Sequence, residues 1–407
     1  MCARYLTTIT DELRALNSGG RGIILATIAL GWGVTIGART IYPVLLPSLR
    51  SAYDFGLTAS GILLSVLFAA YALGQLPGGV LADRAGERIT LTLSVAVSGV
   101  AITFVVISQS TAALFVVTAA FGFAVGFYAI ARFTAIAAIY PDRYGTAAGL
   151  TNTAPELGQA LLPPIAGFVA SIVGWRLGLG FVVPIFVITT VGLWVTVPGP
   201  SEDAATDSDE TEKTSPSVRH VLGALKNPAI LRATAAMILG VSIWQVFTGF
   251  YPTYLVETKG LSSSRAAAVF GLYFAATAVI HPVAGAVYDR FGVRRAYFLS
   301  GIAAVSLAAL PFVDGLGGAI AVSIGMGTLL AFETPTESYL VQSLPSSIEG
   351  TGFGILRTTV FAVGAAGPAV FGVLADRGYF DELFIALAII AVGMILLARQ
   401  LPSVSVR

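Results

Sequence analysis

Seven ionisable side chains stand inside long apolar stretches of this sequence, where a charge is difficult to accommodate. A charged group in the middle of a bilayer costs at least about 2.5–3.5 kcal/mol on insertion scales, so it normally faces a cavity or a partner. The guanidinium of arginine can hold a carboxylate or a phosphate by two parallel hydrogen bonds, and a buried carboxyl or imidazole can carry a proton. The pattern therefore predicts anion binding and proton transfer by Arg39, Arg132, Glu156, His281, Glu333, Glu337 and Arg357.

These charges can also neutralise one another, because three arginines and three glutamates sum to zero. Arg132 can pair with Glu156, and Arg357 can pair with Glu337 or Glu333, in which case the pairs simply hold neighbouring helices together. Arg39 differs, because no carboxylate of its own half of the chain is left over. A buried arginine without a partner predicts an anionic ligand.

The composition defines the elements that must position these residues. Charged residues are 11% of the chain, against about 25% in an ordinary soluble domain. Most of the apolar stretches reach the roughly 20 residues that a helix needs to cross a bilayer, and the alternation of membrane strands is absent. The sequence predicts an all-α membrane protein with twelve transmembrane helices, near 22–46, 57–81, 89–108, 112–139, 145–172, 177–198, 229–255, 264–288, 296–313, 317–343, 350–374 and 382–400.

The chain divides into two similar halves. An acidic segment rich in Ser, Thr and Pro is the only long polar interruption, and the two halves repeat each other at an offset near 205 residues. Two pseudo-symmetric six-helix bundles with a substrate site at their interface are a transporter architecture. We expect an N-terminal segment (1–20), a first bundle (21–198), a linker (199–226), a second bundle (227–401) and a tail (402–407).

The distribution of Lys and Arg predicts the orientation. With both termini in the cytoplasm, 15 cationic residues lie inside and only five outside, as the positive-inside rule requires. We expect a multi-pass protein of the cell membrane, surrounded by lipid and acting as a monomer. The single cysteine, Cys2, excludes an intramolecular disulfide, and we expect no metal, no cofactor and no nucleic-acid partner.

Two charged loops occupy equivalent places in the halves, GGVLADRAGERITL at 78–91 and GAVYDRFGVRRAYF at 285–298. The first resembles the signature loop of the major facilitator superfamily, between its second and third spans. The resemblance implies that Asp83 lies against the cytoplasmic start of span eleven near Gly350, and Asp289 against the start of span five near Gly145. Such contacts would hold the cytoplasmic side closed through Gly79, Asp83, Arg84, Arg88, Gly285, Asp289, Arg290 and Arg294. Alternatively, these arginines only anchor the topology.

Local sequence resembles the anion-transporting branch of this superfamily, which includes organophosphate exchangers. RTIYPVLLP at 39–47 is similar to the first span of that group, and ARFTAIAAIYPDRYGTAAGLTNTAPELGQALLPP at 131–164 is similar to its fourth and fifth spans. The resemblance implies that Arg39 and Arg132 contact the anion and that Asn152 lines the cavity. Trp244 or Gln245 stands where an exchanger of phosphate esters has a second arginine, so a monocarboxylate or sugar acid is favoured, with Arg357 as a replacement cation.

Coupling to protons follows from the acids within the membrane. A carboxyl near an arginine changes its protonation according to whether an anion occupies that arginine. Glu156 and Glu333 are therefore predicted proton carriers in a symport of anion with proton, with Glu337 and His281 as further candidates. Exchange without protons and coupling to sodium remain open alternatives.

Two other classes of function compete with anion transport. A proton-coupled multidrug efflux antiporter would have an intact glycine motif in span five and an acid in span one, where this chain has Arg39. A non-transporting membrane sensor of the same fold is the second alternative. The sequence has no P-loop, H-E-x-x-H or G-x-S-x-G motif, so it predicts no enzyme activity.

Overall fold

The computed structural model describes residues 21–199, 227–345 and 349–401, with the side chains of Asp289 and of residues 349–351 excepted. Twelve helices of this part are long and apolar enough to cross a membrane. The first six spans are formed by α2 (Arg21–Arg39), α3 (Ile41–Tyr53), α4 (Leu57–Ala85), α5 (Glu87–Ile107), α6 (Thr111–Ile139), η2 (Pro141–Arg143), α7 (Tyr144–Val173), α8 (Trp175–Gly180) and α9 (Val183–Thr196). The last six are formed by α11 (Pro228–Glu257), α12 (Ser263–Phe291), α13 (Val293–Ala309), η4 (Leu310–Phe312), α14 (Gly315–Met326), η5 (Leu329–Phe332), α15 (Glu333–Ser343), α16 (Glu349–Gly364), α17 (Ala366–Ala375) and α18 (Phe380–Ala398).

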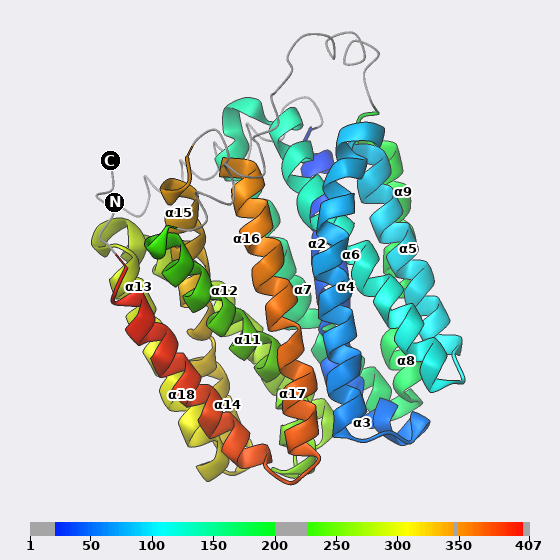
Figure 1. The fold of residues 1–407 in the computed structure, drawn as a ribbon. Helices are drawn as coiled ribbons and strands as arrows, with labels where there is room; N and C mark the ends of the chain where they lie inside the picture. The colour runs from blue at the N-terminus through cyan, green and yellow to red at the C-terminus, as the bar shows by residue number, and fades with distance from the viewer. Residues whose placement is uncertain (1–20, 200–226, 346–348, 402–407) are drawn as a thin grey trace, which may run out of the picture.

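The predicted twelve-helix architecture is confirmed. Most spans begin and end within a few residues of their predicted limits, although the first continues to Tyr53. Spans one and ten are each interrupted, at Thr40 between α2 and α3 and between Met326 and Glu333. The two halves lie side by side, with α4 of the first half next to α16 and α17 of the second (Figure 1).

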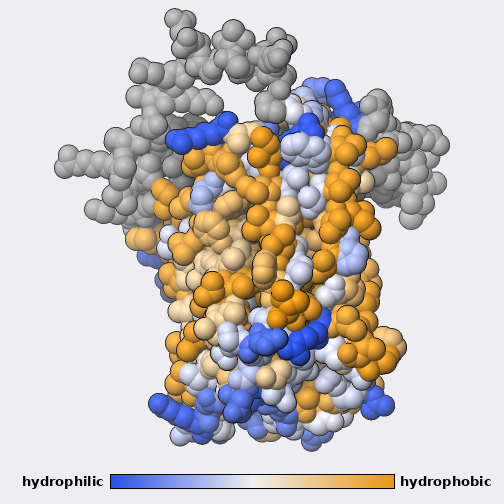
Figure 2. Space-filling model, turned by 90° about the vertical axis from the view of Figure 1, so that its right-hand side faces the viewer, coloured by the Kyte–Doolittle hydropathy of each residue, from blue (hydrophilic) through white to orange (hydrophobic). Residues whose placement is uncertain are grey.

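Apolar side chains face outward along most of the spans, as lipid requires. Figure 2 shows one side of the molecule, where hydrophobic side chains cover the middle and hydrophilic ones gather at the lower end. Val195 and Ile172 are examples of large apolar side chains that are mostly exposed. In contrast, several polar and charged side chains are buried between the helices, including Arg39 and Arg132. This inverted distribution places the candidate functional residues inside the protein.

The two halves pack tightly at one end of the molecule, which we call the far face. A Cβ atom at Gly61 of α4 would lie 2.2 Å from the Pro368 carbonyl oxygen of α17. A Cβ atom at Gly271 of α12 would lie 2.4 Å from Pro164 of α7. Only glycine permits helices to approach this closely. The far face is therefore closed by two helix pairs that cross between the halves.

The opposite end, where the described part stops at Gly199 and resumes at Asn227, we call the linker face. Here Cβ atoms at Gly145, Gly285 and Gly354 would meet no described atom within 4 Å. The ribbons of α4 and of α16–α17 converge toward the far face and diverge toward the linker face (Figure 1). The halves are thus packed together at the far face and separated at the linker face.

Candidate functional site

A cavity of about 200 Å³ lies between the two halves. It is lined by side chains from both, and most of the ionisable residues within the spans converge on it. The predicted site residues that line it are Arg39, Arg132, Asn152, Glu156, Trp244, His281, Glu333, Glu337 and Arg357. Gln245, the remaining predicted substrate residue, does not line it.

Two interruptions of the helices position the charges of this cavity. Arg39 is the last residue of α2, directly before the break at Thr40. Glu333 is the first residue of α15, directly after η5. Thr40 keeps helical backbone angles and its amide donates to the carbonyl oxygens of Ile36 and Gly37, so this interruption is a tightened turn that redirects the span at Arg39.

The guanidinium of Arg39 is buried, with an exposed fraction of 4%. Its Nε and Nη1 atoms have no hydrogen-bond partner, and no carboxylate of the described residues forms an ion pair with it. Its neighbours are aromatic rings, since its Cζ atom lies 4.8 Å from the ring centre of Tyr71 and 5.4 Å from that of Trp244. Cation–π contacts stabilise the charge but leave N–H donors available for an anion.

Arg132 is similarly buried and also lacks a carboxylate partner among the described residues. Its Nη1 donates a hydrogen bond of 2.7 Å to Oδ1 of Asn152, and its Nε has no partner. Its Cζ atom lies 4.6 Å from the ring centre of Trp32. Asn152 thus orients the guanidinium of Arg132 without neutralising it, which leaves a second cation at the cavity wall.

Arg357 has a different environment, because Glu337 neutralises it. Arg357 Nη1 donates to Glu337 Oε1 at 2.6 Å, and both residues belong to the second half. This contact is the pairing that sequence reasoning left open as an alternative to ligand binding. Glu333 also lines the cavity, and it makes no ion pair within the described part of the chain.

Glu156 pairs across the two halves and not within its own. Its Oε1 lies 3.6 Å from Nδ1 of His281, which belongs to α12 of the second half. Glu156 Oε2 and His281 Nε2 are buried, and neither has a hydrogen-bond partner in the described structure. The alternative pairing of Arg132 with Glu156 is therefore not formed. The reason is that Glu156 turns toward the interface between the halves.

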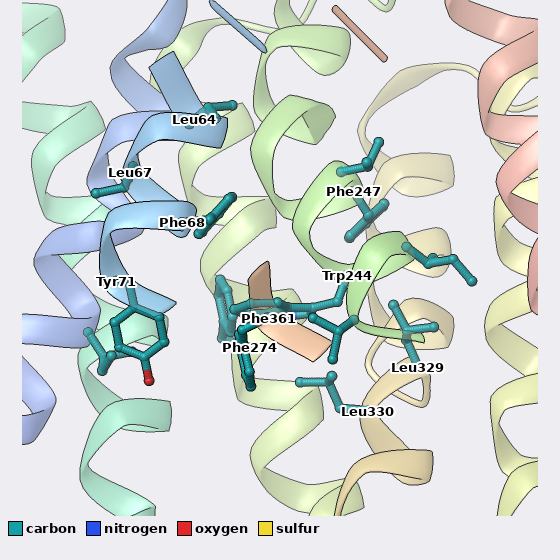
Figure 3. Close-up of a cluster of buried hydrophobic side chains, with 14 of the residues drawn as sticks. Leu64, Leu67, Phe68, Tyr71, Trp244, Phe247, Phe274, Leu329, Leu330 and Phe361 are labelled. Carbon is teal, nitrogen blue, oxygen red and sulfur yellow. The ribbon is translucent and has the colours of Figure 1, made fainter. Parts of the chain in front are cut away.

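Aromatic side chains that sequence reasoning missed close the cavity toward the far face. Phe68 and Tyr71 project from α4 toward Trp244 and Phe361 (Figure 3). The ring centres of Phe68 and Trp244 are 6.2 Å apart, and those of Tyr71 and Phe361 are 5.8 Å apart. Each pair joins the first half to the second. In the sequence Phe68, Tyr71 and Phe361 look like the packing aromatics found on any membrane helix, so only their juxtaposition with Trp244, a predicted substrate residue, marks them.

Gln245 has a structural position next to α16. It is fully buried, and its Nε2 donates to the Phe361 carbonyl oxygen at 3.5 Å. A Cβ atom at Gly364 would lie 3.4 Å from Gln245 Oε1. Since a helix turns by about 100° per residue, Trp244 faces the cavity while its neighbour Gln245 faces another helix. Of the two alternatives for this position, only Trp244 lines the cavity.

The far face is held by polar contacts between the halves. Arg50 Nη1 of α3 lies 2.5 Å and 2.6 Å from the two carboxylate oxygens of Glu257 of α11. Asp376, directly after α17, accepts hydrogen bonds at the first turn of α4. Partial burial acts to raise the pKa of Asp376, but the hydrogen bonds from Thr58 and Leu57 hold this pKa below its usual value. These contacts favour closure of the far face.

The predicted gating residues lie at the linker face and are not engaged between the halves. Asp83 and Arg84 are exposed, and no Asp83 partner appears among the described residues. Arg88 stacks on Trp194, Arg290 lies near Phe291, and Arg294 donates to the Leu401 carbonyl oxygen, so these arginines contact their own halves. Gly79 packs only near Ile130. The Asp289 side chain and the surroundings of Gly350 lie outside the described part.

No group of three or more His, Cys, Asp or Glu side chains that could hold a metal ion occurs among the described residues. The charged groups of the cavity instead alternate in sign and come from both halves. Such an arrangement can bind an anion at the unpaired arginines and a proton at the carboxyls.

Comparisons with known proteins bear on the family and the fold. The sequence matches the profile of the Major Facilitator Superfamily over residues 25–368 and again over residues 266–405. It is 24% identical over 366 residues to a hexuronate transporter of Bacillus subtilis (strain 168), which covers 85% of this chain and 86% of that protein. It is 25% identical over 409 residues to a probable sulfoacetate transporter of Cupriavidus necator, covering 92% of each. The fold is similar to the crystal structure of the nucleoside transporter NupG, with a TM-score of 0.75 at 13% identity over 93% of this chain and 98% of that one.

Proposed function

Because the chain belongs to the major facilitator superfamily, we propose that it is a secondary active transporter that carries a small organic anion by alternating access. The observation that supports this cargo is Arg39, a buried guanidinium in the central cavity whose Nε and Nη1 have no partner. The oxygen atoms of a carboxylate or a sulfonate can accept hydrogen bonds from both of these nitrogen atoms. Arg132, held by Asn152, supplies a second cation from the same half.

The relatives support the same class of cargo, since hexuronate and sulfoacetate are both small organic anions. The charged lining of the cavity differs from the largely apolar surface that hydrophobic drugs require, and this weighs against the multidrug efflux alternative.

We propose that the linker face is cytoplasmic, with both termini on that side and the bundles divided at residues 199–226. The excess of Lys and Arg at this face supports the orientation. Each chain contains its own cavity, so a monomer suffices for transport. In this orientation the structure corresponds to a state that is closed to the outside and opened toward the cytoplasm.

We further propose that protons drive the transport. Glu156 and His281 support this, because they lie 3.6 Å apart in the cavity and come from different halves. A movement that opens the far face would separate them, so their protonation and the conformation would influence each other. Glu333, which has no ion pair in the described structure, is the second candidate.

A thermal-shift screen of purified protein against organic anions tests the cargo class. Stabilisation by carboxylates or sulfonates is expected for the native protein and should disappear in Arg39→Ala. Arg176→Ala is the matched control, because Arg176 is an exposed arginine that stacks on Trp175 and does not line the cavity. Absence of stabilisation by any anion, together with absence of solute movement in proteoliposomes, would instead favour a sensor.

A further inference from the structure

The hexapeptide GVLADR occurs twice in the sequence, at 79–84 and at 372–377. The first copy forms the end of α4 at the linker face, within the signature loop. The second copy is not part of the repeat between the halves, since it lies at the end of α17 at the far face. The same six residues therefore terminate two neighbouring spans at opposite faces of the molecule.

The second copy makes a defined contact with α4. Asp376 Oδ1 accepts from the Leu57 amide at 2.8 Å, and Asp376 Oδ2 accepts from the Thr58 amide at 2.9 Å and the Thr58 hydroxyl at 2.6 Å. These amides are free donors of the first turn of α4, whose own N-cap residue, Gly56, provides no side-chain hydrogen bond. A carboxylate of the second half thus caps a helix of the first.

The glycine of the second copy permits this contact. A Cβ atom at Gly372 would lie 2.3 Å from the Leu57 carbonyl oxygen and 3.1 Å from the Gly61 Cα atom. Any larger residue would push α17 away from α4 and withdraw Asp376 from the amides of α4. The glycine and the aspartate, four residues apart, therefore act together.

The two spans run antiparallel, so their register predicts the contacts at the other end. Leu57 lies opposite Asp376, and Gly61 lies opposite Gly372. The register can be followed from the far face to the linker face, toward higher numbers in α4 and toward lower numbers in α17 and α16. Eighteen residues along this path it places Gly79 opposite Gly354 and Asp83 opposite the first turn of α16. In this structure Gly354 has no described neighbour within 4 Å of a Cβ position, and Asp83 is exposed.

We propose that the two GVLADR copies are alternating caps of one helix pair. Asp376 caps α4 when the far face is closed, and Asp83 caps α16 when the linker face is closed, so that each state has one carboxylate engaged and one free. The linker-face contact is implied by the family resemblance, whereas the far-face cap and its exchange with Asp83 are new. The proposal rests on alternating access but not on the nature of the cargo.

The balance between the two states can be measured without substrate by distances between spin labels. In a Cys2→Ser background, labels at Ala52→Cys and Ser262→Cys report the far face, and labels at Asp142→Cys and Arg295→Cys report the linker face. Asp376→Asn should raise the ratio of far-face-open to far-face-closed molecules by roughly 2- to 5-fold, the effect of an exposed carboxylate at a helix N-terminus. Asp83→Asn should change the ratio in the opposite direction, and the double variant should return it toward the native value.

Two further variants make the result interpretable. Thr58→Val removes one donor to Asp376 without touching the carboxylate, and should shift the ratio in the same direction by less. Asp314→Asn is the matched control at the far face, because Asp314 contacts Lys259 within the second half, and it should leave the ratio unchanged. Unchanged ratios in both Asp376→Asn and Thr58→Val, or shifts of the same sign in Asp376→Asn and Asp83→Asn, would overturn the proposal.

Discussion

Arg39, which is buried, and Arg357, which is partly buried, show two ways of accommodating a guanidinium inside the protein. Arg357 is neutralised by Glu337 at 2.6 Å, whereas Arg39 lies against aromatic rings, forms no ion pair with a carboxylate of the described residues and keeps two nitrogen atoms without hydrogen-bond partners. A neutralised arginine contributes to the assembly of the second half. An arginine without a carboxylate is available for a ligand.

The different role of Arg357 gives a stability prediction. Glu337→Ala leaves the partly buried charge of Arg357 without its partner, and loss of a hydrogen bond to a charged group typically costs about 1.5–3 kcal/mol. The double variant Glu337→Ala with Arg357→Met should recover much of this loss. Thermal unfolding in detergent measures both, and equal instability of the single and double variants would contradict a pairing role.

Sequence reasoning identified which charges enter the cavity but not how they pair. The residue types and their place within apolar spans were sufficient to predict that Arg39, Arg132 and Glu333 line the cavity, since a charge at that depth normally faces the interior. The partner of Glu156 could not be predicted, because His281 belongs to the other half and 125 residues separate them in the sequence. Pairing across an interface depends on the rotation of two helices, which spacing within one helix does not give.

At the scale of elements, the long apolar stretches were sufficient to predict the twelve spans, but not their interruptions. The break beside Arg39 lies between Gly37 and Pro43, and Pro43 has no N–H to donate to the Arg39 carbonyl oxygen four residues back, although the sequence analysis treated this span as one continuous helix. The packing of α4 against α17 was also not predicted. It depends on glycines of two spans that meet only in the folded protein.

Gly61 of α4 and Gly354 of α16 lie at opposite faces of the molecule, and replacing each with alanine is predicted to have opposite effects on which face is closed. A Cβ atom at Gly61 would lie 2.2 Å from the Pro368 carbonyl oxygen, so Gly61→Ala should destabilise closure of the far face by about 1–3 kcal/mol. Gly354→Ala meets no described atom in this state and should instead disfavour closure of the linker face. The far-face label distance should lengthen in the first variant and not in the second. Equal effects would show that the register does not extend along both spans.

At the scale of the whole molecule, the structure combines a closed far face with a separated linker face. The far face is held by the Arg50–Glu257 ion pair and by the hydrogen bonds to Asp376. At the linker face, Asp83 is exposed. Sequence repeats predicted two similar halves, because duplicated loops occur at a constant offset. They could not predict which conformation the chain adopts, since the energies of the two states differ by only a few contacts.

Coupling between the halves predicts a defect in proton movement. Glu156→Gln removes an ionisable group that contacts His281 across the interface, so anion-driven proton uptake into proteoliposomes should be lost while anion binding persists. A pH-sensitive dye inside the vesicles measures this flux. Glu382→Gln, which changes the same residue type at an exposed position in the first turn of α18 and outside the cavity, is the matched control. Unchanged acidification in both Glu156→Gln and Glu333→Gln would exclude these carboxyls as proton carriers.

The central claim is that Arg39 binds the anionic cargo, and a titration tests it most directly. The anion that stabilises the protein most is titrated into native protein, Arg39→Ala and the Arg176→Ala control, with the fluorescence of Trp32 and Trp244 at the cavity wall as the signal. Hydrogen bonds to a charged group contribute about 1.5–3 kcal/mol, so Arg39→Ala should bind roughly 10- to 150-fold more weakly while the control binds normally. An equal dissociation constant in Arg39→Ala and native protein would contradict the account.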